Sequence, residues 1–245
     1  RSCLGNKVQT IEAMHRGERG LLYSDRYAMY VGHAEIELLD GYTRFETLMI
    51  EQIASVTSQS GISLAEQDVQ LVISTTKGNV ELLAENCENL AQEVFIYNSA
   101  EKIANHFGAV NRPIVVSNAC ISGLSAFVIA KREIESGRCK HAIVVGGDVL
   151  SEFITAGFAS FKSISPQPCC PYDAERDGLS LGEAAGAVVL TSDTAYADKA
   201  YIRVAGGAIS NDANHISGPS RTGDGLYYAI RNAMAEAGVS NKEIG

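Results

Sequence analysis

The segment from Pro113 to Gly147 constrains the fold of this chain most strongly. A β-branched run at 113–116 predicts a strand, and residues 121–135 predict a helix whose first half is almost wholly apolar. Residues 141–147 predict a second strand. Parallel neighbours cannot be joined by a tight turn, and a strand, a helix and a strand over this length form a parallel crossover unit. We therefore expect two parallel strands with a helix between them.

The remaining sequence alternates between helical and extended patterns, with no repeat and no low-complexity linker. The same patterns predict helices at 43–60, 80–92, 99–107 and 224–237, and strands at 69–73, 186–192 and 201–209. This alternation predicts a layered α/β fold around a mainly buried mixed sheet. The length is compatible with one or with two domains.

Charge and cysteine usage exclude several classes of protein. The net charge is −9 and there is no basic cluster, which argues against nucleic-acid binding. No apolar run reaches the roughly 18 residues of a membrane span. The six cysteines form no C-x-x-C pair and the histidines are scattered, so we expect no metal site. Reduced thiols in the cytoplasm fit this pattern better than a secreted disulfide framework.

Cys120 lies where a predicted strand gives way to a predicted helix. The first amides of a helix have no partner within the helix, and the helix dipole favours negative charge there. A thiolate is stabilised at such a place, and the same N–H groups can hold the oxyanion formed when a thioester is attacked. The competing interpretation is a buried structural thiol, since free cysteines are often buried.

Two other polar segments carry candidate site residues. Residues 175–186 place charged side chains among glycines just before a strand, which indicates either a buried ion pair behind a site or a polar turn. Residues 212–219 form a polar loop before the last helix, in which His215 is a candidate base or substrate contact. A lone histidine in a loop is more commonly a surface residue.

Together these segments resemble the β-ketoacyl synthases. Residues 118–123 resemble the family's nucleophile segment, residues 170–186 its aromatic and glycine-rich stretch, and Asp212 to Pro219 its D-A-x-H segment. Leu4–Gly5–Asn6 resembles a turn near the family's start. The four motifs come in the family's order and span nearly the whole chain, and they resemble the chain-elongating synthases more than the other branches.

The resemblance implies a thiolase-like fold with two similar α/β halves, each with a five-stranded mixed sheet between helices. Residues 1–245 then correspond to the N-terminal domain, and its opening strand would precede Arg1. The second half, with the catalytic histidines, lies outside this chain. Such synthases usually form homodimers, and some form heterodimers.

The implied reaction has two stages. Cys120 takes an acyl group from an acyl carrier protein and then condenses it with malonyl-carrier, with loss of carbon dioxide, in fatty-acid or polyketide synthesis. No metal or cofactor is implied, because the carrier protein bears the phosphopantetheine arm. His215 matches a family residue at the pantetheine entrance, and Ser217 a position that contacts this arm.

One residue departs from the family pattern. The turn at 75–79 matches a glycine-rich segment that helps to line the acyl pocket, and it contains Lys77. A lysine that points to solvent has no consequence for the substrate. A lysine that points inward indicates an acyl group that is short, polar or aryl-terminated.

Two alternatives to the synthase remain. One is a non-catalytic partner, similar to the chain-length factor of a ketosynthase heterodimer, although the retention of Cys120 argues against it. The other is an unrelated cysteine hydrolase, which requires a base near Cys120. If the 245 residues act alone, we also expect a large exposed apolar face.

Overall fold

The computed structural model describes residues 1–84, 92–196, 201–212 and 220–244. In chain order its elements are α1 (Lys7–His15), β1 (Leu21–Ser24), β2 (Met29–Gly32), α2 (Arg44–Ser60), β3 (Val69–Ser74), α3 (Ile96–His106), β4 (Ile114–Val116), α4 (Ser122–Glu135), β5 (His141–Asp148), α5 (Glu152–Ser160), β6 (Leu181–Gly182), β7 (Ala184–Thr191) and α6 (Asp224–Ala237). Short 3-10 helices cover Val80–Ala84, Gln92–Val94, Thr194–Tyr196 and Asn241–Glu243. None of the helices in these ranges is long and apolar enough to cross a bilayer.

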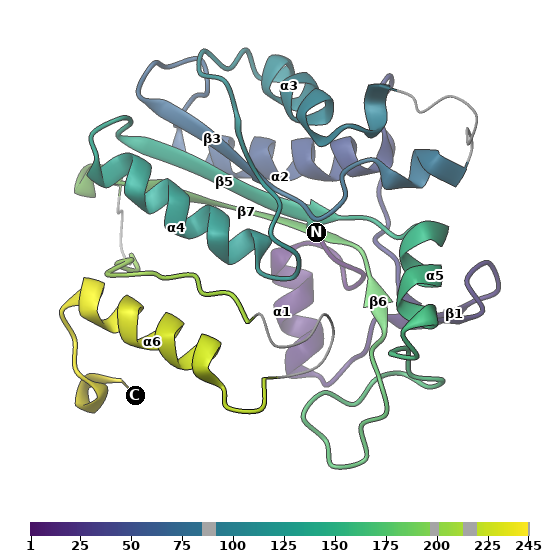
Figure 1. Cartoon of the computed structure of the whole chain (residues 1–245). Helices are drawn as coiled ribbons and strands as arrows, with labels where there is room; N and C mark the ends of the chain where they lie inside the picture. The colour runs from purple at the N-terminus through teal and green to yellow at the C-terminus, as the bar shows by residue number, and fades with distance from the viewer. Residues whose placement is uncertain (85–91, 197–200, 213–219, 245) are drawn as a thin grey trace.

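A mixed sheet with the strand order β4-β3-β5-β7 forms the centre of the molecule (Figure 1). The strand β3 pairs in parallel with β4 and β5, and β7 runs antiparallel to β5, with Val144 opposite Val188. The helix α4 crosses from β4 to β5, so the parallel unit predicted from Pro113 to Gly147 is confirmed, as is the α/β class.

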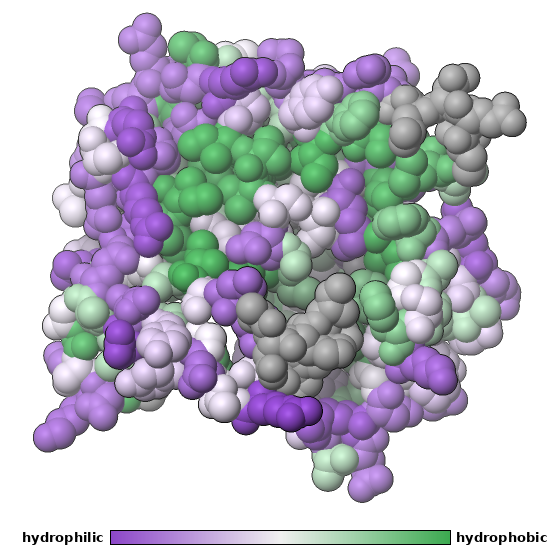
Figure 2. Space-filling model, in the orientation of Figure 1, coloured by the Kyte–Doolittle hydropathy of each residue, from purple (hydrophilic) through white to green (hydrophobic). Residues whose placement is uncertain are grey.

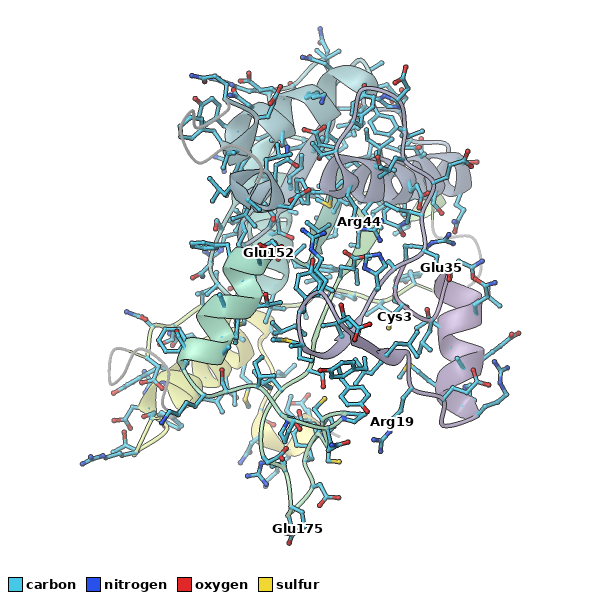
Figure 3. All side chains as sticks on the ribbon, turned by 90° about the vertical axis from the view of Figure 1, so that its right-hand side faces the viewer. Cys3, Arg19, Glu35, Arg44, Glu152 and Glu175 are labelled. Atoms are coloured by element: carbon cyan, nitrogen blue, oxygen red, sulfur yellow. The ribbon has the colours of Figure 1, made fainter. Side chains whose placement is uncertain are left out.

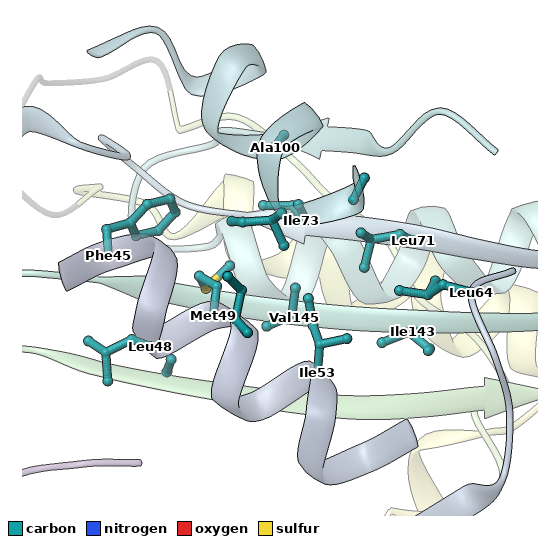
Figure 4. Packing of buried hydrophobic residues seen from close by; sticks show 14 of the residues in the cluster. Phe45, Leu48, Met49, Ile53, Leu64, Leu71, Ile73, Ala100, Ile143 and Val145 are labelled. Carbon is teal, nitrogen blue, oxygen red and sulfur yellow. The ribbon is translucent and has the colours of Figure 1, made fainter. Parts of the chain in front are cut away.

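Alternating side chains of the sheet pack against helices on both of its faces. Ile73, Ile143 and Val145 belong to a cluster with the buried side of α2 and with α3 (Figure 4). The intervening residues Val72 and Val144 belong to a second cluster with α4. This alternation follows from the two-residue period of a strand, and it explains why β3 and β5 read as continuous apolar runs.

The predicted helix at 43–60 is α2, and both of its ends are encoded locally. Thr43 is the N-cap and forms a capping box with Glu46, while Gly61 ends the helix with a φ of 73°. The buried stripe contains Phe45, Leu48 and Met49, at the spacing of one helix face.

A small sheet, β1-β2-β6, lies beside the central one. The strands β1 and β2 form an antiparallel hairpin, and β6 pairs in parallel with the end of β2, with Gly32 opposite Gly182. Because β6 is followed directly by β7, this pairing fixes where β7 enters the central sheet.

One prediction about the elements is wrong. The segment 201–209 is not a strand: it passes close to helices at Gly206 and Gly207, where an added Cβ would lie 2.4 Å from the carbonyl oxygen of Ala233 in α6 and 2.6 Å from Val128 in α4. The central sheet therefore has four strands among the described residues, against the five expected. The helix predicted at 80–92 begins as a 3-10 helix, Val80–Ala84, and residues 85–91 lie outside the described ranges.

Hydrophobic side chains gather on the face that shows α4 and α5 (Figure 2). Among them, Leu124 of α4 and Phe153 of α5 are 64% and 63% exposed. On α6, Leu226 and Ile230 are also exposed. This agrees with the expectation of an extensive exposed apolar face.

Candidate functional site

Cys120 occupies a tight turn between the end of β4 and the start of α4. Ala119 adopts a φ of 45°, in the left-handed region that L-residues with a Cβ rarely adopt. The hydroxyl of Ser122 holds the turn: it accepts from the amide of Asn118 at 2.8 Å and donates to the carbonyl of Ala119 at 2.6 Å. The chain thus reverses within a few residues and presents the thiol of Cys120, which is exposed, beside the first turn of α4.

The start of α4 is fixed from within the same segment. The side-chain amide of Asn118 donates through Nδ2 to Ser125 Oγ at 3.1 Å. The backbone amide of Ser125 donates to the carbonyl of Ile121 at 2.8 Å. Ser122 and Ser125 are both buried. Their short side chains satisfy the turn without filling the space in front of Cys120.

A cavity of about 390 Å³ opens in front of Cys120. It is lined by residues from β3 and the turn after it, from the start of α4, from β5 and from β7, namely Ser74, Thr75, Thr76, Ala119, Cys120, Ser122, Gly123, Phe127, Val144, Gly146, Gly147, Asp148, Gly186, Ala187 and Val188. The cavity therefore lies at the carboxyl ends of the parallel strands, on the side of the sheet that α4 covers.

Glycines keep this cavity open. An added Cβ at Gly186 would meet nothing within 4 Å, whereas one at Gly146 would come within 2.5 Å of Ser74 Oγ. At Gly147 it would come within 2.9 Å of Met49 Sδ and Ala185 Cβ, which belong to the cluster on the other face of the sheet. Space for a ligand is therefore bounded by Ser74 beside Gly146 of β5 and remains free at Gly186 of β7.

The helix terminus supplies the polar chemistry at the thiol. Backbone N–H groups in the first turn of an α-helix lack partners inside the helix. Next to Cys120, the amides of Ile121 and Ser122 donate to the carbonyls of Asn118 and Ala119, both at 3.2 Å, within the turn itself. Partial positive charge accumulates at a helix N-terminus, and it favours an oxyanion that forms beside it. The arrangement suits nucleophilic attack on a carbonyl carbon.

Opposite the helix terminus, Asp148 forms the polar end of the cavity. Its carboxylate accepts from Thr75 Oγ1 at 2.8 Å and from the amide of Thr76 at 3.0 Å. The sequence patterns ended the predicted strand at Gly147 and assigned no role to this residue. A single carboxylate at a strand end has no distinguishing pattern until the fold brings the 75–76 turn beside it.

The turn at 75–79 lies beside the nucleophile segment, as the resemblance implied. The amide of Thr75 donates to the carbonyl of Val116 at 3.2 Å, and Ser117 Oγ donates to the carbonyl of Thr76 at 3.4 Å. Lys77 is half-buried, and its ammonium contacts Thr76 Oγ1. Lys77 is not among the residues that line the cavity, whereas Thr76 is.

The segment 175–186 contains a buried ion pair, the first of the two interpretations that its pattern allowed. The side chain of Glu183 is 1% exposed and pairs with Arg44 at the start of α2. It also accepts from the amide of Ala34 at 2.9 Å and lies 3.0 Å from His33 Nδ1. Figure 3 shows Glu175, near the other end of the segment, at the tip of a loop and away from Arg44. The sequence did not identify Arg44, because more than a hundred residues separate the partners.

His215 and Ser217, predicted as substrate contacts, lie outside the described residues. Their roles stay predictions. Within the described ranges, no group of three or more metal-ligating side chains comes together.

The fold and the site define a class of protein. It is an α/β domain with an exposed cysteine at a strand-to-helix turn, above a cavity at the carboxyl ends of a mixed sheet. The family description "Beta-ketoacyl synthase, N-terminal domain" matches residues 43–195. The chain belongs to this family.

Curated relatives agree. The chain is 38% identical over 141 residues to 3-oxoacyl-[acyl-carrier-protein] synthase 2 of Rhizobium meliloti (strain 1021), covering 53% of this chain and 33% of that protein. It is 36% identical over 142 residues to the synthase 2 of Vibrio cholerae, covering 54% of this chain and 34% of that protein. The matched region spans about a third of these relatives' length.

Solved structures show the same fold. A ketosynthase from Burkholderia phymatum STM815 is 18% identical, with a TM-score of 0.85, and the match covers 100% of this chain and 70% of that one. The structure titled "The ishigamide ketosynthase/chain length factor" is 23% identical with a TM-score of 0.87, and covers 99% of this chain and 69% of that one. The predicted thiolase-like fold is thereby confirmed.

Proposed function

We propose that this chain is the N-terminal domain of a β-ketoacyl-acyl carrier protein synthase, and that Cys120 is its nucleophile. The observation that carries the proposal is the exposed thiol at the N-terminus of α4, above a cavity of about 390 Å³. Family membership supports it, and so do the names of the curated relatives.

In the first stage, the sulfur of Cys120 attacks the carbonyl carbon of the carrier-bound thioester. The tetrahedral oxyanion forms beside the first amides of α4, which stabilise its charge. The bond to the pantetheine sulfur then breaks, the pantetheine thiol leaves with a proton, and the acyl group remains on Cys120 as a new thioester. The carbon atom changes only its sulfur partner, so no oxidant or reductant is required.

In the second stage, malonyl-carrier loses carbon dioxide and its α-carbon attacks the acyl-cysteine. A carbon–carbon bond forms, the bond to Cys120 breaks, and a β-ketoacyl group remains on the carrier. By resemblance, histidines of a second half assist this stage, so residues 1–245 alone are expected to complete the transfer but not the condensation.

The proposed partners follow from the same chemistry. An acyl carrier protein brings the substrate on its own phosphopantetheine arm, so the domain requires no metal or cofactor. A second ketosynthase chain, identical or different, forms a dimer with it; one solved relative is titled as a ketosynthase in complex with its chain length factor. A cytoplasmic location rests on the cysteines, of which the five in the described residues are unpaired.

Intact mass after incubation with an acyl-carrier thioester tests the assignment. We expect one acyl adduct on the wild-type chain, and none on Cys120→Ala. Cys170→Ala is the matched control, because Cys170 is also a free and partly exposed thiol. An adduct that persists in Cys120→Ala, with circular dichroism showing that the variant is folded, would falsify the assignment.

Release of free acid by the chain would instead support the cysteine hydrolase. The described residues place no histidine in the cavity wall with Cys120, so nothing in this geometry favours that alternative. The non-catalytic partner is likewise not favoured, because the thiol is retained and exposed.

A further inference from the structure

Lys77 carries a charge that nothing in the described part of the chain neutralises. Its side chain is half-buried, and its one polar contact is the neutral hydroxyl of Thr76. Among the described residues no carboxylate oxygen lies within 4.0 Å of the Lys77 ammonium, the limit for an ion pair. A partly buried cation without a partner is costly, because it gives up hydration without gaining an anion.

Three other buried or partly buried cations among the described residues are paired with carboxylates. Arg44 binds Glu183, Lys102 binds Glu46 at 2.7 Å, and the buried Lys131 binds two glutamates at 2.6 and 2.7 Å. Arg1 is half-buried without a carboxylate, but its guanidinium donates to the carbonyl of Glu35. Lys77 has only the hydroxyl of Thr76, and this residue lines the cavity of Cys120.

The backbone around Lys77 is held rigidly in place. Thr75 Oγ1 accepts from the amides of Lys77 and Gly78 at 3.3 and 3.0 Å while it donates to Asp148. The next residue, Asn79, is fully buried and donates to Glu46 Oε1 and Ser99 Oγ, both at 3.0 Å. The backbone that carries Lys77 is thus fixed, and no loop has to be ordered when a ligand binds the ammonium.

The turn faces the nucleophile. Thr76, whose hydroxyl contacts the Lys77 ammonium, lines the cavity together with Cys120. The carboxylate of Asp148 also lines the cavity, but its oxygens already accept from Thr75 and from the amide of Thr76. The oxygens of Asp148 are thus occupied as acceptors, whereas the Lys77 ammonium has three donors and only one hydroxyl partner, so it can still donate to an anionic oxygen.

We propose that Lys77 is a specificity-determining residue that, with the hydroxyl of Thr76, binds a carboxylate carried by the acyl group delivered to Cys120. The inference rests on the proposed function, since it assigns the substrate class of that same site. A carboxylate fits because a lysine ammonium and a hydroxyl can each donate to one of its oxygens. A straight alkyl chain leaves the ammonium unpaired.

Acylation rates of Cys120 measured by intact mass test the proposal. The substrates are N-acetylcysteamine half-thioesters of succinic, glutaric, adipic and suberic acids, each beside the straight-chain acyl thioester of equal carbon number. For at least one length, we expect Lys77→Met to lower the carboxyl-to-alkyl rate ratio about tenfold or more, which is the loss typical of one charge-assisted hydrogen bond. Lys77→Arg should retain most of the ratio, and Lys7→Met, at an exposed lysine of α1, should not change it.

Several outcomes overturn the proposal, and they are distinguishable. If Lys77→Met leaves the carboxyl-to-alkyl rate ratio unchanged at every length, and its thermal melt is unaltered, Lys77 does not select the substrate. Transfer of an alkyl acyl group to Cys120 in the same experiment still supports the proposed function. Absence of any Cys120 adduct in the wild type removes both. A third outcome is that Lys77→Met slows the transfer of carboxyl and alkyl acyl groups equally when the carrier protein delivers them, but does not change transfer from N-acetylcysteamine thioesters. The ammonium then binds the carrier's phosphate, not the acyl group. Lys77→Gln serves if the methionine variant does not fold.

Discussion

Glu81 offers a quantitative test of the fold around the site. It lies in the 3-10 helix after the Thr75–Asn79 turn, and both of its carboxyl oxygens are buried without a hydrogen-bond partner among the described residues. Burial raises the pKa of Glu81 from 4.5 to about 7; its own amide and that of Phe45 oppose the shift, and the charges of Glu46 and Glu183 add to it. The neutral acid is therefore the form that the fold prefers.

The sign and size of the effect follow from this shift. Because the pKa is higher in the folded state, the favourable contribution of Glu81 is complete below pH 4.5 and is lost as the pH rises through 7. At 1.36 kcal/mol per unit of pKa, ionising the buried acid lowers the free energy of unfolding by about 3 kcal/mol in total. Roughly 2.5 kcal/mol of this loss falls between about pH 5 and pH 8.

The perturbation is Glu81→Gln, which keeps the shape and removes the charge. We expect the free energy of unfolding of the variant, relative to wild type, to rise by about 2.5 kcal/mol between about pH 5 and pH 8. Urea denaturation followed by circular dichroism at several pH values measures this difference. Glu12→Gln, at an exposed position of α1, is the control and should show a flat difference. A difference for Glu81→Gln that stays within about 0.5 kcal/mol across this range would refute the reasoning.

Three other substitutions test the site and its support. Gly147→Ala should lower the free energy of unfolding by about 1–3 kcal/mol, because the new methyl group meets Met49, the side chain of Ala185 and the Ala184 backbone oxygen. Gly186→Ala should leave the urea midpoint nearly unchanged yet slow acylation by bulky acyl groups, since it projects into open cavity. Glu183→Gln should cost about 3 kcal/mol in the same denaturation assay, because it leaves Arg44 partly buried without its anion; a loss below about 1 kcal/mol would contradict that role.

The parallel unit around Cys120 was predictable because each of its parts is encoded locally. The strand, the apolar helix and the second strand follow one another along the chain. The ends of α2 are likewise encoded by its capping residues, Thr43 and Gly61. In such segments the local pattern and the final packing agree.

What could not be predicted depends on contacts distant in sequence. The segment 201–209 has the apolar residues of a strand, but it packs between α4 and α6 through Gly206 and Gly207. The pairing of Glu183 with Arg44 and the approach of the 75–76 turn to Asp148 likewise appear only once the sheet is assembled. A sequence pattern indicates the secondary structure that a segment prefers, but not the side chains against which the segment packs.

The cavity walls have a consequence for the order in which the protein becomes competent during synthesis. Its lining runs from Ser74 to Val188, and the last wall, β7, pairs with β5 across the intervening residues 149–183. Contacts of such separation form late, because the entropy of closing the intervening loop must be lost first. A nascent chain that has exposed Cys120 but not yet β7 holds its thiol without a pocket. Cys120 and β7 therefore leave the ribosome at different times, and the thiol is open to adventitious oxidation in the interval.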